Sequence, residues 1–509
     1  MLALEASGQP GFNRLYGFEQ DFIGNVFLNV LRDSDTIVLF GGGTPTFPPY
    51  LQGLLFAKLD TQGNVLFQKY YPDPDGEEYG ANLNFDLIKT SDNGYGLTGV
   101  ALQSNSGVFV KLTQDGEIEF YKKYDPSPGL QYQPRKILET PGGFLLCGFK
   151  SMQNYDIQVF LMKTDKQGNF LWEKTYGEPG VLDAPSSLIK TDDNLYTMGI
   201  VKAKGLGEPP FSTSDTWTKG WLLQVDSTGN VVTSYESTLN KNIGIGGLKR
   251  MPDGWLFGSV DFELQSPFAW GSRSKIVRTG EDIKDVIWER YVSPTTFAGN
   301  TVFDIKPTPD GHWVSVGQWI TPIPASPDDP PNFQGGSTFK FSSEGDSIWA
   351  RLDTAFYHPV CGSTSHLGGV AVLPDGSVVA AGYANSYCFP LVRSWAWVIK
   401  IDPDGCIDTL ACFPVTTPAG EAESALPALS AFPNPATDYV DFRLSGTVPG
   451  GSTVLTVSDL GGRPVWSAAV RFGEAAVRWE TGNLPSGLYF YRLTRDGEVV
   501  GAGKVVLVK

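Results

Sequence analysis

Residues 163–177, KTDKQGNFLWEKTYG, carry the pattern that decides the fold of this chain. An apolar stretch ends at Lys163, and the polar run Asp165–Asn169 that follows contains Gly168. Glycine easily adopts the positive φ that a tight turn needs. A second strand with alternating side chains begins at Phe170. The segment therefore predicts a β-hairpin.

This hairpin pattern recurs along the chain. Its seven copies, of which the fifth is degraded, begin at Lys58, Lys111, Lys163, Gln224, Ile276, Lys340 and Lys400. A second pattern, an apolar strand with a turn rich in Asp, Gly and Asn, also has seven copies, which begin at Arg32, Thr90, Glu139, Lys190, Arg250, Pro307 and Leu373. The turn glycines Gly63, Gly116 and Gly168 are 53 and 52 residues apart. Four-stranded units of about 50–60 residues are typical of propeller blades, so the sequence predicts an all-β fold with a seven-bladed β-propeller.

The first strand of the chain is expected to close the ring. The segment FNRLYG at 12–17 matches WEKTYG at 172–177, so the chain begins with an outermost strand that has no blade before it. Pairing this strand into the last blade would remove an exposed edge. The segment CIDTLACF at 406–413 could occupy the same position, and the sequence leaves the choice open.

Length variation falls between the second and third strands of the blades, on what we call the long-loop face. The loops span residues 43–52, 204–219, 263–274, 320–336 and 384–393. Their aromatic residues include Phe47, Tyr50, Phe211, Trp217, Phe268, Trp270, Phe333 and Tyr387. These side chains either pack the loops onto the disc or bind a ligand, and variable loops often carry function. We predict a binding face for a glycan or a protein.

Composition excludes several classes of partner. The 509 residues carry a formal net charge of −16, which argues against nucleic acid and against anionic membranes. We also expect no membrane span, because no apolar run approaches about 18 residues. A monomer is expected.

Recognisable catalytic and metal-binding motifs are missing from the sequence. The three histidines, His312, His358 and His366, do not stand at metal-ligand spacing. The carboxylates of PDPDGEEYG, from Pro72, lack the D-x-D-x-D-G pattern of a calcium loop. We predict no metal, no cofactor and a protein that is not an enzyme. The alternative is a polysaccharide hydrolase or lyase with acidic residues at the mouth of the propeller channel.

Five cysteines are present. Cys147 lies in an apolar strand and is expected to be a buried thiol. The other four could form two disulfides in an oxidising compartment and are Cys361, Cys388, Cys406 and Cys412.

The repeats stop after Cys412, and the rest of the chain has a different character. Residues 414–430 are rich in Pro, Ala, Ser and Glu, which is typical of a linker. Residues 431–509 contain short alternating strands, which predict a small β-sandwich. The expected organisation is a propeller at 1–413, a linker at 414–430 and a sandwich at 431–509.

Four motifs of the last segment occur in a fixed order up to the end of the chain: FPNPATD at 432–438, VSDLGGRPV at 457–465, LPSGLYFYRL at 484–493 and GKVVLVK at 503–509. On these motifs, the segment resembles the type A C-terminal sorting domain of cargo of the type IX secretion system of Bacteroidetes. The motif residues are Phe432, Pro433, Asn434, Pro435, Asp459, Gly461, Gly487, Tyr489 and Lys504.

The resemblance implies an export route through the periplasm, a partner in the type IX secretion machinery, and a secreted or surface-attached product whose sorting domain is removed. Such cargo begins with a signal peptide, and MLALEASGQPGFNR at 1–14 lacks one, so we expect a trimmed or incomplete N-terminus. The sequence thus predicts an exported binding or adhesion protein.

Overall fold

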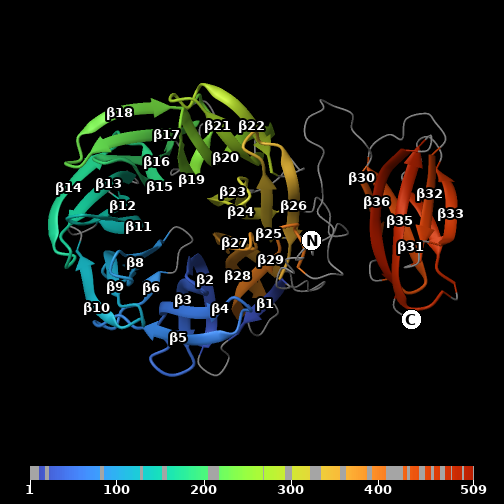
Figure 1. The fold of residues 1–509 in the computed structure, drawn as a ribbon, viewed down its shortest axis with the longest axis horizontal. Coiled ribbons are helices and arrows are strands. Elements are labelled where there is room, and N and C mark those ends of the chain that lie inside the picture. Colours follow the sequence, from blue (N-terminus) through green and yellow to red (C-terminus); the bar gives the residue numbers. More distant parts are fainter. Residues whose placement is uncertain are drawn as a thin grey trace, which may run out of the picture. The chain divides into compact units, whose positions relative to one another are not determined.

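The computed structural model describes most of the chain. The described residues are 11–17, 22–80, 85–125, 130–151, 157–204, 217–266, 269–292, 301–320, 334–355, 363–386, 393–407, 428–432, 436–445, 453–459, 463–470, 476–482, 484–495 and 498–507. The chain divides into two compact units, residues 1–417 and residues 418–509. In the first unit, the described strands form seven blades around a central opening (Figure 1).

Each blade has an innermost strand that borders the opening. These strands are β2 (Phe22–Asp33), β6 (Tyr79–Gly80) with β7 (Leu87–Lys89), β11 (Gln131–Thr140), β15 (Leu182–Asp192), β19 (Ile243–Met251), β23 (Thr301–Pro307) and β27 (Ser363–Val372). They start at the long-loop face and end at the short turns that lead to the second strands. Two of them also form a single parallel bridge to the third strand of the preceding blade, β15 to β13 and β27 to β25.

The second and third strands of each blade form its buried centre. The second strands are β3 (Thr36–Pro45), β8 (Tyr95–Ala101), β12 (Gly143–Ser151), β16 (Leu195–Lys204), β20 (Gly254–Ser266), β24 (Trp313–Ile320) and β28 (Val378–Ser386). The third strands are β4 (Gly53–Asp60), β9 (Ser106–Leu112), β13 (Ile157–Thr164), β17 (Trp217–Asp226), β21 (Ala269–Thr279), β25 (Gln334–Phe341) and β29 (Arg393–Ile401). All residues of β8 and β9 are buried, because neighbouring blades cover both faces of these sheets.

The fourth strands lie at the rim. They are β5 (Val65–Tyr71), β10 (Ile118–Tyr124), β14 (Phe170–Tyr176), β18 (Val231–Glu236), β22 (Val286–Tyr291), β26 (Ser347–Asp353) and, in the last blade, β1 (Phe12–Tyr16). In β5 and β10 the first two residues are exposed and the later residues are partly or fully buried. The predicted seven-bladed propeller is confirmed.

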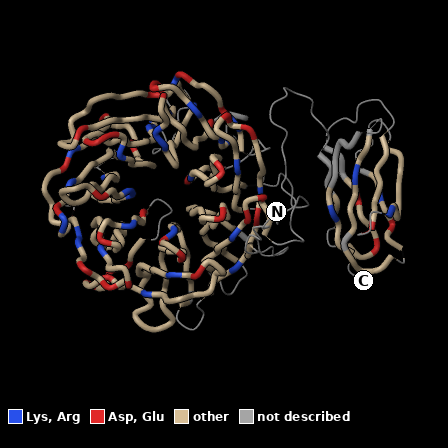
Figure 2. The backbone as a smooth tube through the Cα atoms, viewed as in Figure 1, with Lys and Arg blue, Asp and Glu red and all other residues tan. Residues whose placement is uncertain are grey.

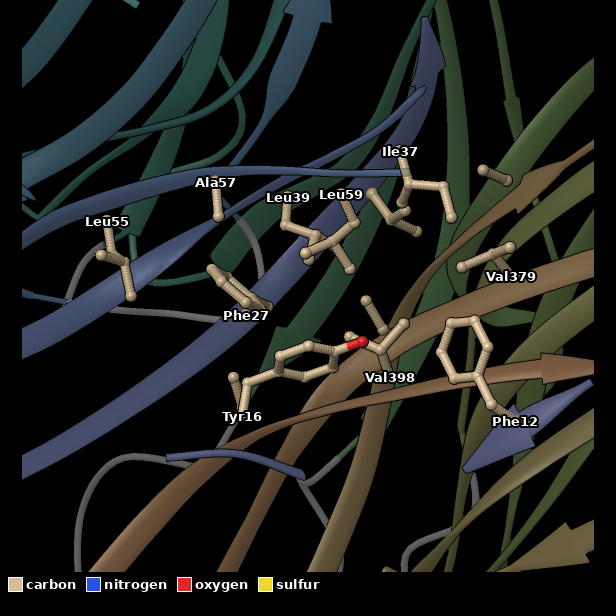
Figure 3. Packing of buried hydrophobic residues seen from close by; sticks show 14 of the residues in the cluster. Phe12, Tyr16, Phe27, Ile37, Leu39, Leu55, Ala57, Leu59, Val379 and Val398 are labelled. Carbon is tan, nitrogen blue, oxygen red and sulfur yellow. The ribbon is translucent and has the colours of Figure 1, made fainter. Parts of the chain in front are cut away.

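The N-terminal strand closes the ring. β1 pairs with β29 antiparallel from Phe12–Lys400 to Tyr16–Ala396, so FNRLYG takes the outer position that the sequence left open. Tyr16 also donates a hydrogen bond of 2.7 Å to the carbonyl of Gly63 in the first blade. Figure 3 shows Tyr16 beside Val398, in a core cluster that joins the last blade to the first.

The tyrosine contact to a turn glycine repeats between other blades. Tyr71 donates to the Gly116 carbonyl at 2.7 Å, and Tyr124 donates to the Gly168 carbonyl at 2.8 Å. Gly168 has a φ of 74°, which the predicted hairpin turn requires. Asp165 completes this turn by accepting the backbone N–H of Asn169 at 2.8 Å. The opening sequence pattern therefore encodes both a hairpin and an interblade contact.

The second unit is a β-sandwich of two sheets within its described residues. A three-stranded sheet contains β30 (Ala428–Phe432), β31 (Tyr439–Ser445) and β34 (Ala476–Glu480). A four-stranded sheet contains β32 (Thr453–Ser458), β33 (Pro464–Val470), β35 (Gly487–Arg495) and β36 (Glu498–Leu507). Phe442, Trp479 and Tyr491 belong to the core between the sheets. The predicted sandwich is confirmed.

Several motif residues of the sandwich have identifiable structural roles. Tyr489 is buried and donates to the Pro485 carbonyl at 2.9 Å, while Asp459 accepts from the Arg463 backbone at 3.0 Å. Gly487 pairs with Leu507 and Lys504 with Phe490 in the β35–β36 ladder, and Phe432 pairs with Asp441. Pro433, Asn434, Pro435 and Gly461 lie outside the described residues.

The cysteines are described in part. Cys147 is a buried free thiol, and burial raises its pKa. Cys406 is disulfide-bonded. Cys361, Cys388 and Cys412 lie outside the described residues, so the predicted connectivity stays a prediction. A search of the described part of the chain for a helix long and apolar enough to cross a membrane found none.

Candidate functional site

A cavity of about 660 Å³ occupies the central channel of the propeller. All seven innermost strands contribute to its wall. This volume lies within the range of about 300–1,000 Å³ that is usual for ligand sites.

Two layers of side chains line the channel. The pairing of each innermost strand with the second strand of its blade shows which residues occupy equivalent positions in different blades. The first layer is polar in five blades, with Asn29, Asp86, Lys136, Ser187 and Asp304. The second layer, two residues further along each strand, is aliphatic in five blades, with Leu31, Ile88, Leu138, Ile189 and Ala371. In the other two blades of this second layer, lysine replaces the aliphatic residue, at Lys249 and Lys306.

The channel is basic although the protein is acidic. Five cationic side chains and two carboxylates line the cavity, which gives its wall a formal charge of +3 in a chain of −16: Arg32, Arg135, Lys136, Lys249, Lys306, Asp86 and Asp304. Blue and red segments border the opening of the ring in Figure 2. Such a reversal of charge favours anions in the channel.

Two of the lysines have carboxylate partners. Lys306 Nζ lies 3.1 Å from Asp304 Oδ2, and Lys136 Nζ lies 3.7 Å from Asp86 Oδ1. The Asp304 charge raises the pKa of Lys306. Burial acts to raise the pKa of Asp304, but the charges of Lys306 and Lys249 outweigh it and lower that pKa. Both members of the pair are therefore charged at neutral pH.

Lys249 is different because no ion pair to it is found among the described residues. Its Nζ donates to the Leu248 carbonyl at 3.3 Å. Burial, reinforced by the positive charges of Lys306 and Lys136, lowers the pKa of Lys249 to about 8, and the charges of Asp304 and Asp86 oppose this shift without cancelling it. Since Lys136 belongs to the third blade and Lys249 to the fifth, this influence links blades that are not neighbours in the ring.

Charged side chains of the channel wall are partly exposed to water. The side chain of Lys306 is 42% exposed and that of Asp304 is 21% exposed. Arg135 stacks over Phe149 at 4.6 Å, and burial lowers its pKa to about 10, so it stays charged at neutral pH. Water in the channel can therefore exchange with a ligand that brings its own polar groups.

A set of packed aromatic side chains lies at one side of the channel wall. Phe303 lines the cavity, and its ring centroid lies 4.8 Å from that of His366. His366 also stacks on Tyr383 at 5.4 Å. Burial lowers the pKa of His366 to about 3, so this histidine is neutral and belongs to the core. His358 lies outside the described residues.

The aromatic residues predicted from the sequence lie elsewhere. Phe47 and Tyr50 are 55% and 49% exposed in the first blade, whereas Trp217 begins β17 in the fourth blade and is half-buried. Lys219 Nζ lies 5.2 Å from the ring centroid of Trp217. Phe211, Phe268, Phe333 and Tyr387 lie outside the described residues, and nothing is described of the Trp270 side chain. The first and fourth blades are not neighbours, so the described aromatic residues do not form one patch.

One acidic cluster outside the channel could suggest a cation site. Carboxylate oxygens of Asp73, Asp75 and Glu77 lie within 4.8 Å of one another. Lys123 Nζ already lies 3.1, 2.8 and 2.7 Å from these three groups. The lysine therefore supplies the positive charge that a metal would bring.

Sequence reasoning missed the channel residues. The signal was present in the repeats, because Lys249 and Lys306 stand where the equivalent strands carry Ile88 or Leu138. Lysine in an aliphatic repeat position is unexpected unless its ammonium reaches water or a ligand. The alternative prediction of acidic residues at the channel applies to Asp86 and Asp304, but cations outnumber them.

The comparisons with known proteins identify one part of the chain. Residues 430–508 match the family described as the secretion system C-terminal sorting domain. This confirms the resemblance found in the sequence and indicates export, and with it a secreted or cell-surface protein. No curated protein matches the sequence.

Solved structures resemble the propeller only remotely. An ulvan lyase of a polysaccharide lyase family is 9% identical, with 77% of this chain and 97% of the other covered and a TM-score of 0.47. A Synechocystis apocarotenoid oxygenase is 10% identical, with 78% and 94% covered and a TM-score of 0.39. A Penicillium chrysogenum α-L-arabinanase complexed with arabinobiose is 12% identical, with 62% and 92% covered and a TM-score of 0.37.

These comparisons correct one prediction. The ulvan lyase and the arabinanase are enzymes by their titles, and this finding contradicts the prediction that the chain is not an enzyme. The reasoning failed because it searched for motifs within short sequence windows. In a propeller, side chains that meet in the channel come from blades that are far apart in the sequence.

Proposed function

We propose that this exported protein is an enzyme that binds and processes an anionic saccharide in the central channel of its propeller. The observation that carries the proposal is the charge of the channel wall, formally +3 in a chain of −16. A cavity with one dominant charge sign concentrates ligands of the opposite sign. Lys249 adds an ammonium that forms no close ion pair with a carboxylate among the described residues, although the charges of Asp304 and Asp86 act on it.

The two layers of the wall suit a saccharide. Sugars present hydroxyl groups at their edges and C–H groups on their faces. The polar layer offers Asn29 and Ser187 beside the charged groups, and the aliphatic layer offers Leu31, Ile88 and Leu138. The volume of about 660 Å³ suits a short oligosaccharide or the end of a chain better than a folded protein segment.

The long-loop face supplies a second, outer contact in this proposal. Phe47 and Tyr50 are exposed within the long loop of the first blade. Aromatic rings at such a position can stack on sugar units of a longer chain. The remaining predicted aromatic residues of this face are proposed to serve the same purpose.

Binding of acidic and neutral saccharides tests the proposal. We expect the full-length protein to bind oligogalacturonate at least about tenfold more tightly than a neutral arabinan fragment of equal length, since a charge-assisted contact contributes about 1.5 kcal/mol or more. The preference should shrink in high salt because ions screen the attraction. Calorimetric titration of both ligands measures this. Equal affinity for the two, or no binding of any carboxylated or sulfated saccharide, would contradict the proposal.

The export role has its own test. Deleting residues 431–509 should leave a folded propeller that accumulates in the periplasm, because the domain that the secretion machinery reads is gone. Fractionation and immunoblotting of the host cells measure the distribution, with the full-length protein as control. Surface delivery of the truncated protein at the normal level would overturn this role.

A further inference from the structure

We infer that Lys249 is the base of a β-elimination that cleaves a uronate-containing chain in the channel. This inference rests on the proposed function and names its substrate class and reaction. Three observations on the position of the Lys249 amine, its neighbours and the carboxylates of the wall carry it.

First, Lys249 is the lysine of this group whose amine is available. Lys136 and Lys306 are each held by a carboxylate, whereas the described contact of Lys249 Nζ is to the Leu248 carbonyl. A salt bridge favours the charged form of a lysine, while a half-buried lysine with no close carboxylate partner releases its proton more easily. The local structure therefore separates the roles of these three lysines.

Second, the neighbours of Lys249 can prepare the substrate. Lys306 lies on the adjacent innermost strand, and the charge of Lys136, two blades away around the channel, also acts on Lys249. An ammonium beside a uronate carboxylate withdraws electron density from it, which makes the hydrogen on the adjacent carbon more acidic. The charged groups that act on Lys249 are thus Lys306 and Asp304 from β23, Lys136 from β11 and Asp86, which directly precedes β7.

Third, the carboxylates are poorly suited to glycoside hydrolysis. Hydrolysis of this kind needs one protonated carboxyl group with a raised pKa. Asp304 has a lowered pKa and is paired with Lys306. Asp86 accepts the Ile137 backbone N–H at 3.1 Å and faces Lys136. Elimination needs a base instead, and the neutral amine of Lys249 is one.

The step balances without another reactant. The neutral Lys249 amine takes the proton from the carbon that carries the uronate carboxylate. The released electron pair forms a carbon–carbon double bond to the neighbouring carbon, and the bond from that carbon to the glycosidic oxygen breaks. The Lys249 ammonium then gives its proton to the leaving oxygen. One chain becomes two, and one product is an unsaturated uronate.

Replacing Lys249 with Arg tests the assignment, because guanidinium keeps the charge but has a pKa above about 12 and does not act as a base. With polygalacturonate as substrate, we expect the wild-type rate to rise with pH through about 8, where the amine loses its proton. In Lys249→Arg the rate should fall by at least about 100-fold and lose this pH dependence, while oligogalacturonate binding changes by less than about threefold. The ultraviolet absorbance of the new conjugated double bond measures the rate.

Lys122→Met is the matched control, since Lys122 lies on the outer strand β10 and bonds to Asn169. Its rate and pH profile should equal those of the wild type. If the wild type binds uronate but forms no unsaturated product, or if Lys249→Arg retains the rate and its pH dependence, this inference is wrong while the proposed function stands. If acidic saccharides do not bind at all, both fail.

Discussion

Replacing Tyr16 with Ala should lower the free energy of unfolding of the propeller by about 3–5 kcal/mol, the usual cost of truncating a buried aromatic side chain. Tyr16 is 8% exposed and packs in a cluster with residues of both the last and the first blade. The variant also loses the hydrogen bond to the Gly63 carbonyl. Because β1 forms the outer edge of the last blade among the described residues, weakening this contact weakens the closure of the ring.

Denaturant unfolding of the full-length protein, followed by tryptophan fluorescence, measures this change in the propeller transition. Leu15→Ala is the matched control on the same strand, since Leu15 is 39% exposed. The control should change the stability by less than about 0.5 kcal/mol. A loss below about 1 kcal/mol for Tyr16→Ala would show that the N-terminal strand does not hold the ring closed.

Replacing Lys123 with Met should cost about 3–5 kcal/mol at neutral pH, because removing one partner of a buried charge network leaves the other charges uncompensated. The side chains of Lys123 and Asp73 are 13% and 0% exposed. The variant leaves Asp73, Asp75 and Glu77 crowded together with no cation within the cluster.

The dependence on pH identifies the mechanism. Burial acts to raise the pKa values of Asp73 and Glu77, but hydrogen bonds, from Lys123 among others, lower both. These groups therefore stabilise the wild type above about pH 4, and that stability is lost as the pH falls through the lowered pKa values. Without Lys123, the carboxylates repel one another, so the variant should gain stability as the pH falls from 7 towards 5.

Thermal unfolding at several pH values measures the effect, and Lys122→Met, one residue away, is the control. Lys122 bonds to the neutral side chain of Asn169, so its replacement should change the stability little at any pH. A Lys123→Met variant whose deficit stays the same from pH 7 to pH 5 would contradict the electrostatic explanation.

Much of the fold could be predicted because the repeat is strong in local sequence. The turn at Asp165–Asn169 and the tyrosine at Tyr176 recur in successive blades, and each copy predicts two strands and a turn. The closure of the ring by β1 could be predicted only in part. The match of 12–17 to 172–177 indicated an outermost strand, but only the pairing with β29 shows which segment takes that place.

The channel could not be predicted in the same way. Lys136, Lys249 and Lys306 belong to three blades and meet only because the ring closes. The aromatic loop residues drew attention because exposed aromatic side chains are conspicuous in a sequence. A lysine inside an aliphatic strand is less conspicuous until the strands are aligned by their pairing, as for Lys249 with Leu256 and Lys306 with Val314.

The affinity of Lys249→Met for oligogalacturonate tests the central claim most directly. Methionine keeps much of the length of lysine, removes its charge and leaves no described ion pair broken. We predict that the dissociation constant rises about tenfold or more at pH 7, with the affinity of Lys122→Met unchanged, when both are titrated in full-length protein at low salt. Wild-type affinity in Lys249→Met would show that the basic channel is not where the saccharide binds.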